Sequence, residues 1–333
     1  MSVDIKFIAR IANVSPATVS RVMNGSKPVS PELKDKILQI VQKYNYRPNS
    51  MARAMVLKKS NLIGVMTPNV SSNFHAVITA AIERVAEQNG YSVVISNISD
   101  DFQKQLKSLQ SLSEHQIDGL ILLHENTENE IKEFVKNTWI PIVTASVTIP
   151  HCFLPSVGID EEKASYDATK YLISLGHKNI GGIFGKCYSL GEVRKKGFVK
   201  ALNESGLTIN SNFITYADCT IESGRNACQQ LFERGNFPSA LFCISDEIAI
   251  GCIDYLKKHH ILVPQDVSII GFDDIQLASV FTPSLTTVHQ PIDEIGSAAA
   301  KLLIDIIEKR VVKEKNILFP SNLVVRESAT TVK

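Results

Sequence analysis

Residues 8–25 read IARIANVSPATVSRVMNG, and this stretch decides the fold of the first part of the chain. An apolar helical pattern ends at Ala12, and Ser15 followed by Pro16 starts another one shortly afterwards. Serine is a preferred N-cap and proline is favoured at the first helical position. The second helix ends near Gly25, because glycine commonly follows the last turn of a helix. The stretch therefore predicts two short helices joined by a tight turn.

A helical pattern lies on either side of that turn. Asp4 can cap a first helix from Ile5 to about Ala12, and Ser30 with Pro31 can begin a third helix that runs to about Tyr44. Two short helices with a third packed across them form a helix-turn-helix. The sequence thus predicts this DNA-binding motif, and the alternative is a three-helix bundle with a solvated basic face.

The second helix would be the one that reads DNA. Val19, Val22 and Met23 have the spacing of a buried face, which leaves the opposite face for a major groove. Arginine is the usual bidentate partner of guanine, small apolar groups contact the thymine methyl, and hydroxyls bind phosphates or base edges. The DNA-binding residues expected in this part of the chain are Ser15, Pro16, Ala17, Thr18, Ser20, Arg21 and Asn24.

The charge distribution supports this reading. Residues 1–60 hold eleven Lys and Arg against three Asp and Glu, a net charge of +8, whereas the remainder holds 24 against 31, a net of −7. Such a split indicates a module for nucleic acid or an anionic surface joined to something else. A non-specific DNA-packaging protein would share the basic part, but it would not need the long acidic remainder.

No 18-residue apolar run and no basic-then-apolar leader occur, so we expect no membrane span and no export. The six cysteines include no C-x-x-C pair, and several lie in apolar runs. A cytoplasmic protein with reduced, mostly buried thiols is the expectation.

From residue 61 onward, short apolar runs alternate with amphipathic segments. The expected strands are 62–67, 91–98, 119–124, 141–146, 180–185, 213–217, 240–245 and 267–272. The expected helices are 74–89, 102–116, 128–137, 162–175, 191–205, 222–234 and 247–260. This alternation predicts two doubly wound units with buried parallel sheets. Ligands bind beyond the carboxyl ends of such strands, so two units that face each other would form a binding cleft.

Nothing in the sequence favours an enzyme. It contains neither G-x-G-x-x-G nor G-x-x-x-x-G-K-[ST], and the adjacent carboxylates of Asp273 and Asp274 should diverge on a strand or turn. His259 and His260 lack the companion residues of an H-E-x-x-H metal site. We therefore expect no catalytic residue, no metal site and no cofactor.

The head sequence, IARIANVSPATVSRVMNG followed by VSPELKDKILQIVQKYNYRPNSMARAM, resembles the lactose-repressor/galactose-repressor (LacI-GalR) family of bacterial transcription regulators. The remainder, with LGHKNIGGIFG, SDEIAIG and VPQDVSIIGFDDI, resembles the effector domain of the same family, which is similar to periplasmic sugar-binding proteins. The resemblance covers nearly the whole chain. It implies an all-α helix-turn-helix head plus an α/β periplasmic-binding-protein-like effector domain with two doubly wound parallel-sheet subdomains.

The resemblance also implies the domain boundaries. Residues 1–48 would form the DNA-binding domain, 49–60 a hinge helix and linker, and 61–333 the effector-binding and dimerisation domain. Within the latter, subdomain 1 would comprise 61–159 and 292–318, and subdomain 2 would comprise 160–289 and 322–330. The crossings between subdomains fall near Asp160, near His289–Pro291 and near Pro320.

Six residues are implied to contact the effector, which are Phe74, His75, Arg194, Cys219, Ser245 and Asp273. The family keeps an aromatic side chain at Phe74, Arg194 would bind effector hydroxyls or an anionic group, and Asp273 would accept hydrogen bonds from hydroxyls. Ser245 and Cys219 depart from the asparagine and the aromatic residue that many members have there, so a second stacking platform is missing. The alternative for each residue is a structural cap or turn.

The implied function is a repressor of a carbohydrate-utilisation operon that binds a pseudo-palindromic double-stranded DNA operator as a homodimer. A small-molecule effector, a sugar or sugar derivative, would control its affinity. A co-repressed regulator of the purine or nucleoside type is the alternative, and a solute-binding protein is a more remote one. The apolar stripe Ala76, Val77, Ala80 and Ala81 could join two copies. Only five residues follow Ser328, without a heptad repeat, so we expect a dimer that lacks the extra tetramerising helix of the lactose repressor.

The segment 49–60, NSMARAMVLKKS, sits where this family carries its hinge helix. About eight residues cannot hold a helix alone, so it would fold when two copies meet in a minor groove. The expected DNA contacts are Asn49, Ala52, Arg53 and Met55, with Met55 as a wedge where most relatives have leucine. A plain flexible linker is the alternative.

Overall fold

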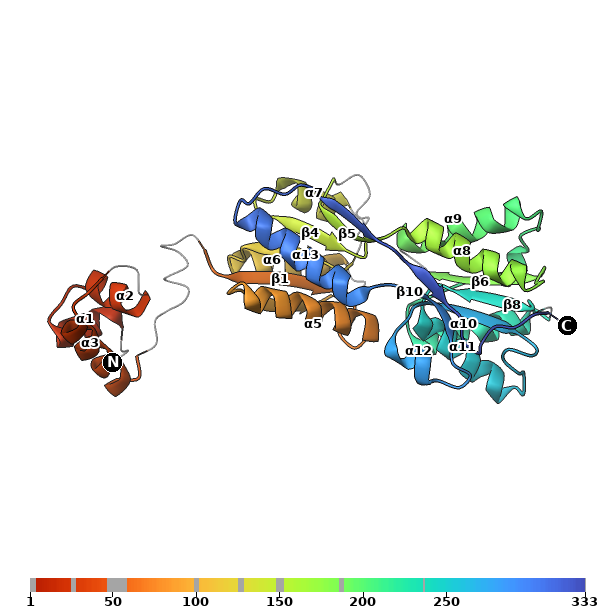
Figure 1. The fold of residues 1–333 in the computed structure, drawn as a ribbon, viewed down its shortest axis with the longest axis horizontal. Coiled ribbons are helices and arrows are strands. Elements are labelled where there is room, and N and C mark those ends of the chain that lie inside the picture. Colours follow the sequence, from red (N-terminus) through yellow and green to blue (C-terminus); the bar gives the residue numbers. More distant parts are fainter. Residues whose placement is uncertain are drawn as a thin grey trace. The chain divides into compact units, whose positions relative to one another are not determined.

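The computed structural model describes residues 4–24, 28–46, 59–98, 102–124, 129–147, 153–185, 189–235 and 237–332. The described residues form two compact units, one that ends at Ser60 and one that begins at Asn61 (Figure 1). Each unit has its own hydrophobic core.

The first unit contains three helices, α1 (Ile5–Ala12), α2 (Pro16–Asn24) and α3 (Pro31–Lys43). Asp4 caps α1 by accepting a hydrogen bond from the Phe7 N–H at 2.7 Å, and Ser30 caps α3. Asn13 ends α1 at a φ of 58°, a left-handed conformation that asparagine tolerates. The turn expected from the sequence is therefore present.

The core of the first unit is made by one face of each helix. Ile8, Val19 and Ile37, one from each helix, are fully buried and pack together. The Phe7 ring meets the Tyr44 ring edge-on at 5.1 Å between centroids. The helices thus pack through the apolar positions that their sequences repeat at helical spacing.

The first half of the second unit, here called the first lobe, is built on a six-stranded sheet of order β11-β5-β4-β3-β1-β2. All of its pairings are parallel. Its strands are β1 (Leu62–Thr67), β2 (Ser92–Asn97), β3 (Gly119–Leu122), β4 (Ile142–Ala145), β5 (Ser156–Ile159) and β11 (Asn316–Phe319). Its helices are α5 (Asn73–Gln88), α6 (Phe102–Glu114), α7 (Asn129–Asn137) and α13 (Ile292–Ile307).

The other half, here called the second lobe, has a six-stranded sheet of order β12-β10-β9-β8-β6-β7. Its strands are β6 (Ile180–Gly185), β7 (Ile214–Ala217), β8 (Ala240–Cys243), β9 (Ser268–Asp273), β10 (Thr286–His289) and β12 (Asn322–Val324). Its helices are α8 (Glu161–Ser174), α9 (Ser189–Glu204), α10 (Ile221–Glu233), α11 (Asp246–Lys258) and α12 (Gln276–Val280), with a short 3-10 turn at Ser211–Phe213. Only the edge strand β12 pairs antiparallel in this sheet, so the predicted class of two doubly wound parallel sheets is confirmed.

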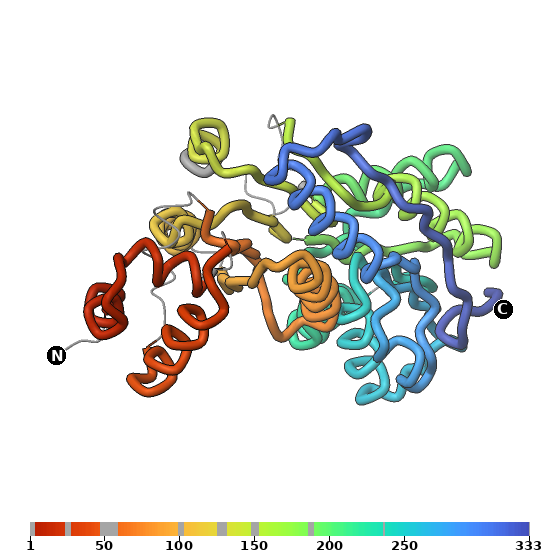
Figure 2. Tube along the Cα trace, turned by 60° about the vertical axis from the view of Figure 1, so that its left-hand side comes forward, coloured from red at the N-terminus to blue at the C-terminus, as the bar shows by residue number. Residues whose placement is uncertain are grey.

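The chain crosses between the lobes after β5, after β10 and after β11 (Figures 1 and 2). Central strands such as β6 and β9 are buried along their whole length, as continuous apolar runs in parallel sheets require. Because the carboxyl ends of parallel strands share one edge of a sheet, the residues that follow them gather in one place.

Two further sequence features have a place in the fold. Cys228, Cys243 and Cys252 are free thiols buried in the second lobe, whereas Cys219 is an exposed residue with a free thiol. Among the described helices, none combines the length and the apolar character that crossing a bilayer demands.

Candidate functional site

The second helix of the first unit presents the polar and small residues that the sequence assigned to DNA. Ser15, Pro16, Ala17 and Arg21 are exposed, whereas the apolar face of α2 is buried in the core. The small residues lie in the first turn of α2 and Arg21 in its last turn, and side chains of these types can bind base edges or phosphates.

Some of these residues also have a structural task. The Ser15 hydroxyl accepts a hydrogen bond from the Thr18 N–H at 3.2 Å and lies 2.9 Å from the Thr18 hydroxyl. Ser15 is therefore the N-cap of α2, and both hydroxyls are partly engaged. Ser20 is half-buried. The Asn24 side chain and the hinge residues Asn49, Ala52, Arg53 and Met55 lie outside the described residues.

A cavity of about 280 Å³ lies between the two lobes of the second unit. Most of its lining follows the carboxyl ends of the strands, where the parallel sheets predict a ligand site. Its polar lining residues are Asn69, Ser72, His75, His124, Ser146, Arg194, Asp218, Cys219, Thr220, Ser245, Glu247 and Asp273, and Phe74 adds an aromatic hydrocarbon face. All six effector residues expected from the resemblance thus border one cavity.

Arg194, on α9, lines the cavity from the second lobe. Its side chain is only 5% exposed, and its Nε donates to Glu161 at 2.8 Å. Its guanidinium stacks on the Phe272 ring at 3.7 Å and also bonds to the Ile244 carbonyl oxygen. A buried arginine held on several sides is fixed in direction, so it can present its remaining N–H groups to a ligand without reorganising.

Asp273 lies at the end of β9, 3.7 Å from the Arg194 guanidinium. Gln290 donates a hydrogen bond of 2.7 Å to one of its oxygens. Burial raises the pKa of Asp273 to about 7, with Glu161 adding to the rise and Arg194 opposing it. A carboxyl group desolvated in this way gains from hydroxyl donors that a bound ligand would bring.

The first lobe supplies an aromatic and histidine wall. The Phe74 and His75 rings meet edge-on at 5.3 Å. Burial, followed by the neighbouring His124, lowers the pKa of His75 to about 4, so His75 is neutral at physiological pH. Its Nδ1 and the buried Ser146 Oγ have no hydrogen-bond partner among the described residues. Buried polar atoms of this kind are usually satisfied by a ligand or water.

The two residues that depart from the family pattern have different surroundings. Ser245 is the N-cap of α11, since its hydroxyl accepts a hydrogen bond from the Ile248 N–H at 3.3 Å. It therefore has the helix-capping role that the sequence offered as the alternative to an effector contact. Cys219 follows β7, and its pKa rises to about 11 because its thiol is desolvated in the cavity wall and because Asp273 lies nearby. Both still line the cavity.

Sequence reasoning missed other cavity residues. His124 and Ser146 closed two of the predicted strand segments, and Asp218 directly follows a third. The rule that ligands bind beyond strand ends could have found all three. Glu161 and Gln290 follow β5 and β10, two strands that the sequence patterns did not mark, and they act on the cavity through Arg194 and Asp273.

Comparisons with known proteins agree with this geometry. Residues 4–49 match the bacterial regulatory proteins of the lacI family, and residues 169–329 match the periplasmic binding protein-like domain. The chain is 37% identical over 330 residues to catabolite control protein A of Priestia megaterium, covering 98% of this chain and 99% of that protein. It is 32% identical over 332 residues to the ribose operon repressor of Haemophilus influenzae, covering 99% of each.

The fold is likewise that of a solved regulator. The structure of the lac repressor dimer bound to operator and the anti-inducer ONPF superimposes with a TM-score of 0.86 at 27% identity, covering 99% of this chain and 100% of that one. A helix-turn-helix unit joined to a two-lobed, periplasmic-binding-protein-like unit defines a class of DNA-binding transcriptional regulators, not of enzymes. The chain belongs to the lacI family of bacterial regulatory proteins.

Proposed function

We propose that this regulator represses genes of carbohydrate utilisation and that a sugar or sugar derivative in the inter-lobe cavity controls its affinity for an operator. In this proposal residues 1–48 read the DNA, residues 49–60 form the hinge helix, and residues 61–333 bind the effector. The protein would act in the cytoplasm, where its DNA is.

The pairing of Arg194 with Asp273 in the cavity carries the proposal. Arg194 offers hydrogen-bond donors and Asp273 offers an acceptor, 3.7 Å apart. A polyhydroxylated ring needs both at once, because each hydroxyl donates and accepts. Phe74 adds an apolar face against which one side of a sugar ring can pack.

The names of the relatives support carbon metabolism as the setting. One is a catabolite control protein and another is a ribose operon repressor. Both align with this chain over nearly its whole length, so the cavity as well as the reading helix falls within the similar region.

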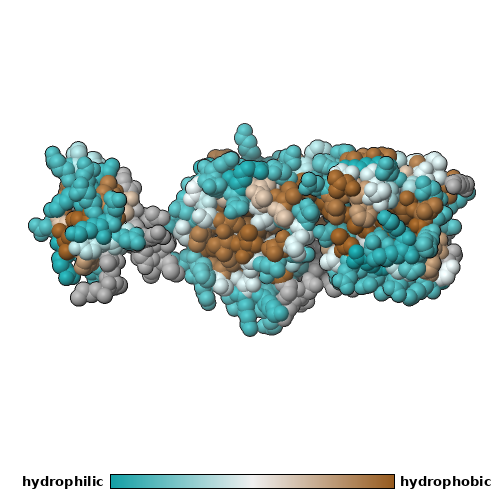
Figure 3. All heavy atoms as spheres, turned by 90° about the horizontal axis from the view of Figure 1, so that it is seen from below, coloured by the Kyte–Doolittle hydropathy of each residue, from teal (hydrophilic) through white to brown (hydrophobic). Residues whose placement is uncertain are grey.

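A homodimer suits the reading helix, since one helix-turn-helix reads a half-site and a two-fold dimer matches a pseudo-palindrome. Hydrophobic residues gather on one face of the first lobe (Figure 3), and α5 exposes Ala76, Val77 and Ala80. Ala81, which the sequence placed on the same stripe, is fully buried against Gly296 of α13. The exposed stripe offered for dimerisation is therefore narrower than expected.

The proposed mechanism is a shift between two arrangements of the lobes. An effector that contacts both walls of the cavity favours the closed arrangement by its differential affinity. A coupling of about 1–3 kcal/mol would change operator affinity roughly 5–150-fold.

Two measurements test the proposal. The full chain is screened by thermal shift against sugars, sugar phosphates, uronates and nucleosides, because a ligand selective for the folded state raises the melting temperature. Any stabilising compound is then titrated into a complex with operator DNA selected from a random pool, at one fixed salt concentration.

We expect a sugar or sugar derivative to raise the melting temperature, and Asp273→Asn to abolish the rise. Glu222→Gln, which removes an exposed acid from the first turn of α10, is the control and should keep it. Stabilisation by nucleosides alone, or a response that survives Asp273→Asn, would overturn the sugar assignment.

A further inference from the structure

The Asp273 carboxyl enters the cavity from an unusual piece of backbone. Asp273 has a φ of 114° and Asp274 a φ of 56°, so two consecutive non-glycine residues adopt positive φ. Such conformations are rare and persist only where the surrounding structure holds them. The groups that hold this turn therefore determine where Asp273 points.

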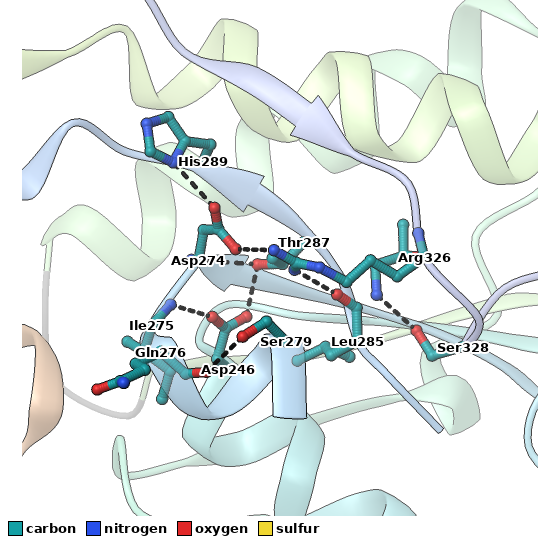
Figure 4. Close-up of polar contacts among 11 residues, drawn as sticks. Asp246, Asp274, Ile275, Gln276, Ser279, Leu285, Thr287, His289, Arg326 and Ser328 are labelled. Carbon is teal, nitrogen blue, oxygen red and sulfur yellow. Dashed lines mark hydrogen bonds and ion pairs between the residues drawn. The ribbon is translucent and has the colours of Figure 1, made fainter. Parts of the chain in front are cut away.

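Asp246, the first residue of α11, is one of these groups (Figure 4). Its side chain is fully buried, and one carboxyl oxygen accepts a hydrogen bond from the Ile275 N–H at 2.8 Å. The other accepts from the Thr287 hydroxyl at 2.5 Å. Asp246 thereby joins the end of the Asp273–Ile275 turn to β10.

Strand β9 makes room for the Asp246 carboxyl group. A Cβ atom at Gly271 would lie 2.2 Å from the Asp246 Oδ1, so only glycine fits on β9 at this point. Asp246 also stands in the first turn of α11, where any acid would interact favourably with the helix dipole. An interaction with the helix dipole does not require a buried side chain, two hydrogen-bond donors or a glycine opposite it. The geometry of Asp246 therefore indicates that it holds the turn that ends at Ile275.

The same turn reaches the segments that connect the lobes. The Asp274 carboxylate accepts from Arg326, just after β12, at 2.6 Å and lies 2.9 Å from the His289 Nδ1 at the end of β10 (Figure 4). On its other side Asp273 accepts from Gln290 at 2.7 Å. Gln290 directly follows β10, where the chain crosses to the first lobe. Arg326 lies two residues after β12, the strand that the chain forms when it returns to the second lobe.

We propose that Asp246 is a positioning residue, which holds the Asp273–Ile275 turn so that Asp273 faces the cavity while Asp274 binds two of the segments that connect the lobes. A ligand that moves Asp273 would then also move Asp274, because both residues belong to one short turn. The movement would reach the segments that connect the lobes through the contacts of Asp274. This inference rests on the proposed function for the role of Asp273 as an effector contact. Its structural content does not depend on the identity of the effector.

Cys219 provides a reporter for the position of Asp273. Its pKa is raised to about 11, first by desolvation of the thiol in the cavity wall and then by Asp273, with Glu247 raising it further and Arg194 and Ser245 lowering it. If Asp273 turns away, the thiolate becomes easier to form and alkylation becomes faster, because the thiolate is the nucleophile. The reporter needs neither effector nor operator, so it can fail or succeed independently of the proposed function.

The experiment uses the full chain with Cys152→Ser and Cys187→Ser, and measures alkylation of Cys219 by iodoacetamide from pH 8 to 11 with peptide mass spectrometry. We expect Asp246→Ala to lower the apparent pKa of Cys219 by about one unit, which makes the reaction about tenfold faster at pH 9. Asp273→Asn removes the Asp273 charge altogether, so its alkylation profile shows the largest decrease in the Cys219 pKa that displacement of Asp273 can cause. Asp254→Ala, another aspartate of α11 that pairs with Arg225 and Lys258, is the matched control and should leave the profile unchanged.

Two readouts protect the result against misfolding. The buried thiols Cys228, Cys243 and Cys252 must stay unreactive, and Asp246→Asn, which keeps one acceptor, should fold and shift the profile less than Asp246→Ala. A crystal structure of the alanine variant, or of the asparagine variant if alanine does not fold, should show the Asp273 carboxyl displaced.

Two results would overturn the proposal. One is a crystal structure in which Asp273 and Ile275 keep their wild-type positions. The other is an Asp246→Ala variant whose Cys219 alkylation profile equals that of the wild type, although Asp273→Asn shifts that profile.

Discussion

The Glu247 Oε1 accepts a hydrogen bond of 3.3 Å from the backbone N–H of Asn73, a residue 174 positions earlier in the chain. Glu247 belongs to the first turn of α11 in the second lobe, and Asn73 begins α5 in the first lobe. The Ser72 side chain bonds to Glu247 instead of capping its own helix. One carboxylate therefore satisfies the N-terminus of a helix across the cavity, where the helix dipole favours a negative charge.

We predict that Glu247→Ala shifts the protein toward a more open arrangement of the lobes even without a ligand. Losing this cross-lobe bond should cost the closed arrangement about 1 kcal/mol, which is roughly a fivefold change in the ratio of closed to open molecules. Double electron–electron resonance between non-cysteine spin labels, one in each lobe, measures the distance distribution.

The matched control is Glu222→Ala, which removes an exposed acid from the first turn of α10 in the same lobe. Unchanged distances in Glu247→Ala, or equal changes in both variants, would show that the contact does not influence closure.

A second prediction concerns the buried pair of Arg194 and Glu161, whose side chains are 5% and 10% exposed. Arg194→Met leaves the Glu161 carboxylate buried without its partner, so we expect the free energy of unfolding at pH 7 to fall by about 3 kcal/mol. Burial already raises the pKa of Glu161 above 4.5, and losing Arg194 raises it further. A raised pKa means that protonation relieves the cost as the pH falls, so the loss should be smaller at pH 5.

Urea unfolding at both pH values measures the effect. The double variant Arg194→Met/Glu161→Gln should recover at least half of the loss, because the Glu161 charge is gone and the other buried acid, Asp273, keeps its hydrogen bond from Gln290. Arg225→Met is the control: its partner Asp254 is partly exposed, and losing that pair should cost less than about 1 kcal/mol. A double variant as unstable as the sum of its single variants would contradict the prediction.

A third prediction follows from His177, which is 3% exposed and ties the C-terminal segment to the second sheet. Its Nδ1 lies 2.9 Å from the Ser239 hydroxyl, and its Nε2 lies 3.1 Å from the Ser268 hydroxyl and 3.0 Å from the Thr330 carbonyl oxygen. Burial lowers its pKa below 6.5, against the opposing effect of Thr330. Since the unfolded chain binds the proton more readily, stability should be lost as the pH falls below 6.5.

His177→Gln should therefore remove part of the acid sensitivity, so that the loss of unfolding free energy from pH 6.5 to pH 5 is smaller than in the wild type by about 1 kcal/mol. Chemical denaturation at several pH values gives the slope. His115→Gln removes an exposed histidine as the control, and the same change of slope in both variants would rule out His177 as the cause.

Much of this arrangement could be predicted from local patterns in the sequence. The caps Asp4, Ser15 and Ser30 and the apolar helical spacing fixed the three helices of the first unit, because helix ends depend on neighbouring residues. The continuous apolar runs predicted eight strands of the second unit within a few residues of their bounds. Arg194 and Asp273 came only from the resemblance to a family.

What local patterns could not predict depends on distant contacts. The edge strands β11 and β12 are short and half-exposed, and their apolar runs are only three residues long, too short to mark a strand. Glu247 looked like an ordinary acid in the first turn of a helix, and only the fold brings it to Asn73. The role of Asp246 likewise depends on its hydrogen bonds from Ile275 and Thr287, which follow it in the chain by 29 and 41 residues.

The last prediction concerns base recognition by α2, where Arg21 is exposed on the face opposite the buried Val19 and Val22. If Arg21 binds a base edge, Arg21→Ala should weaken operator binding by about 1–3 kcal/mol and leave binding to scrambled DNA far less affected. Lys36→Ala, which removes one exposed positive charge from α3, should lower both affinities by similar small factors. Fluorescence anisotropy on both DNAs at one salt concentration gives the two ratios. A proportional loss on operator and scrambled DNA in Arg21→Ala would reassign Arg21 to the phosphate backbone, because phosphate contacts carry no sequence information.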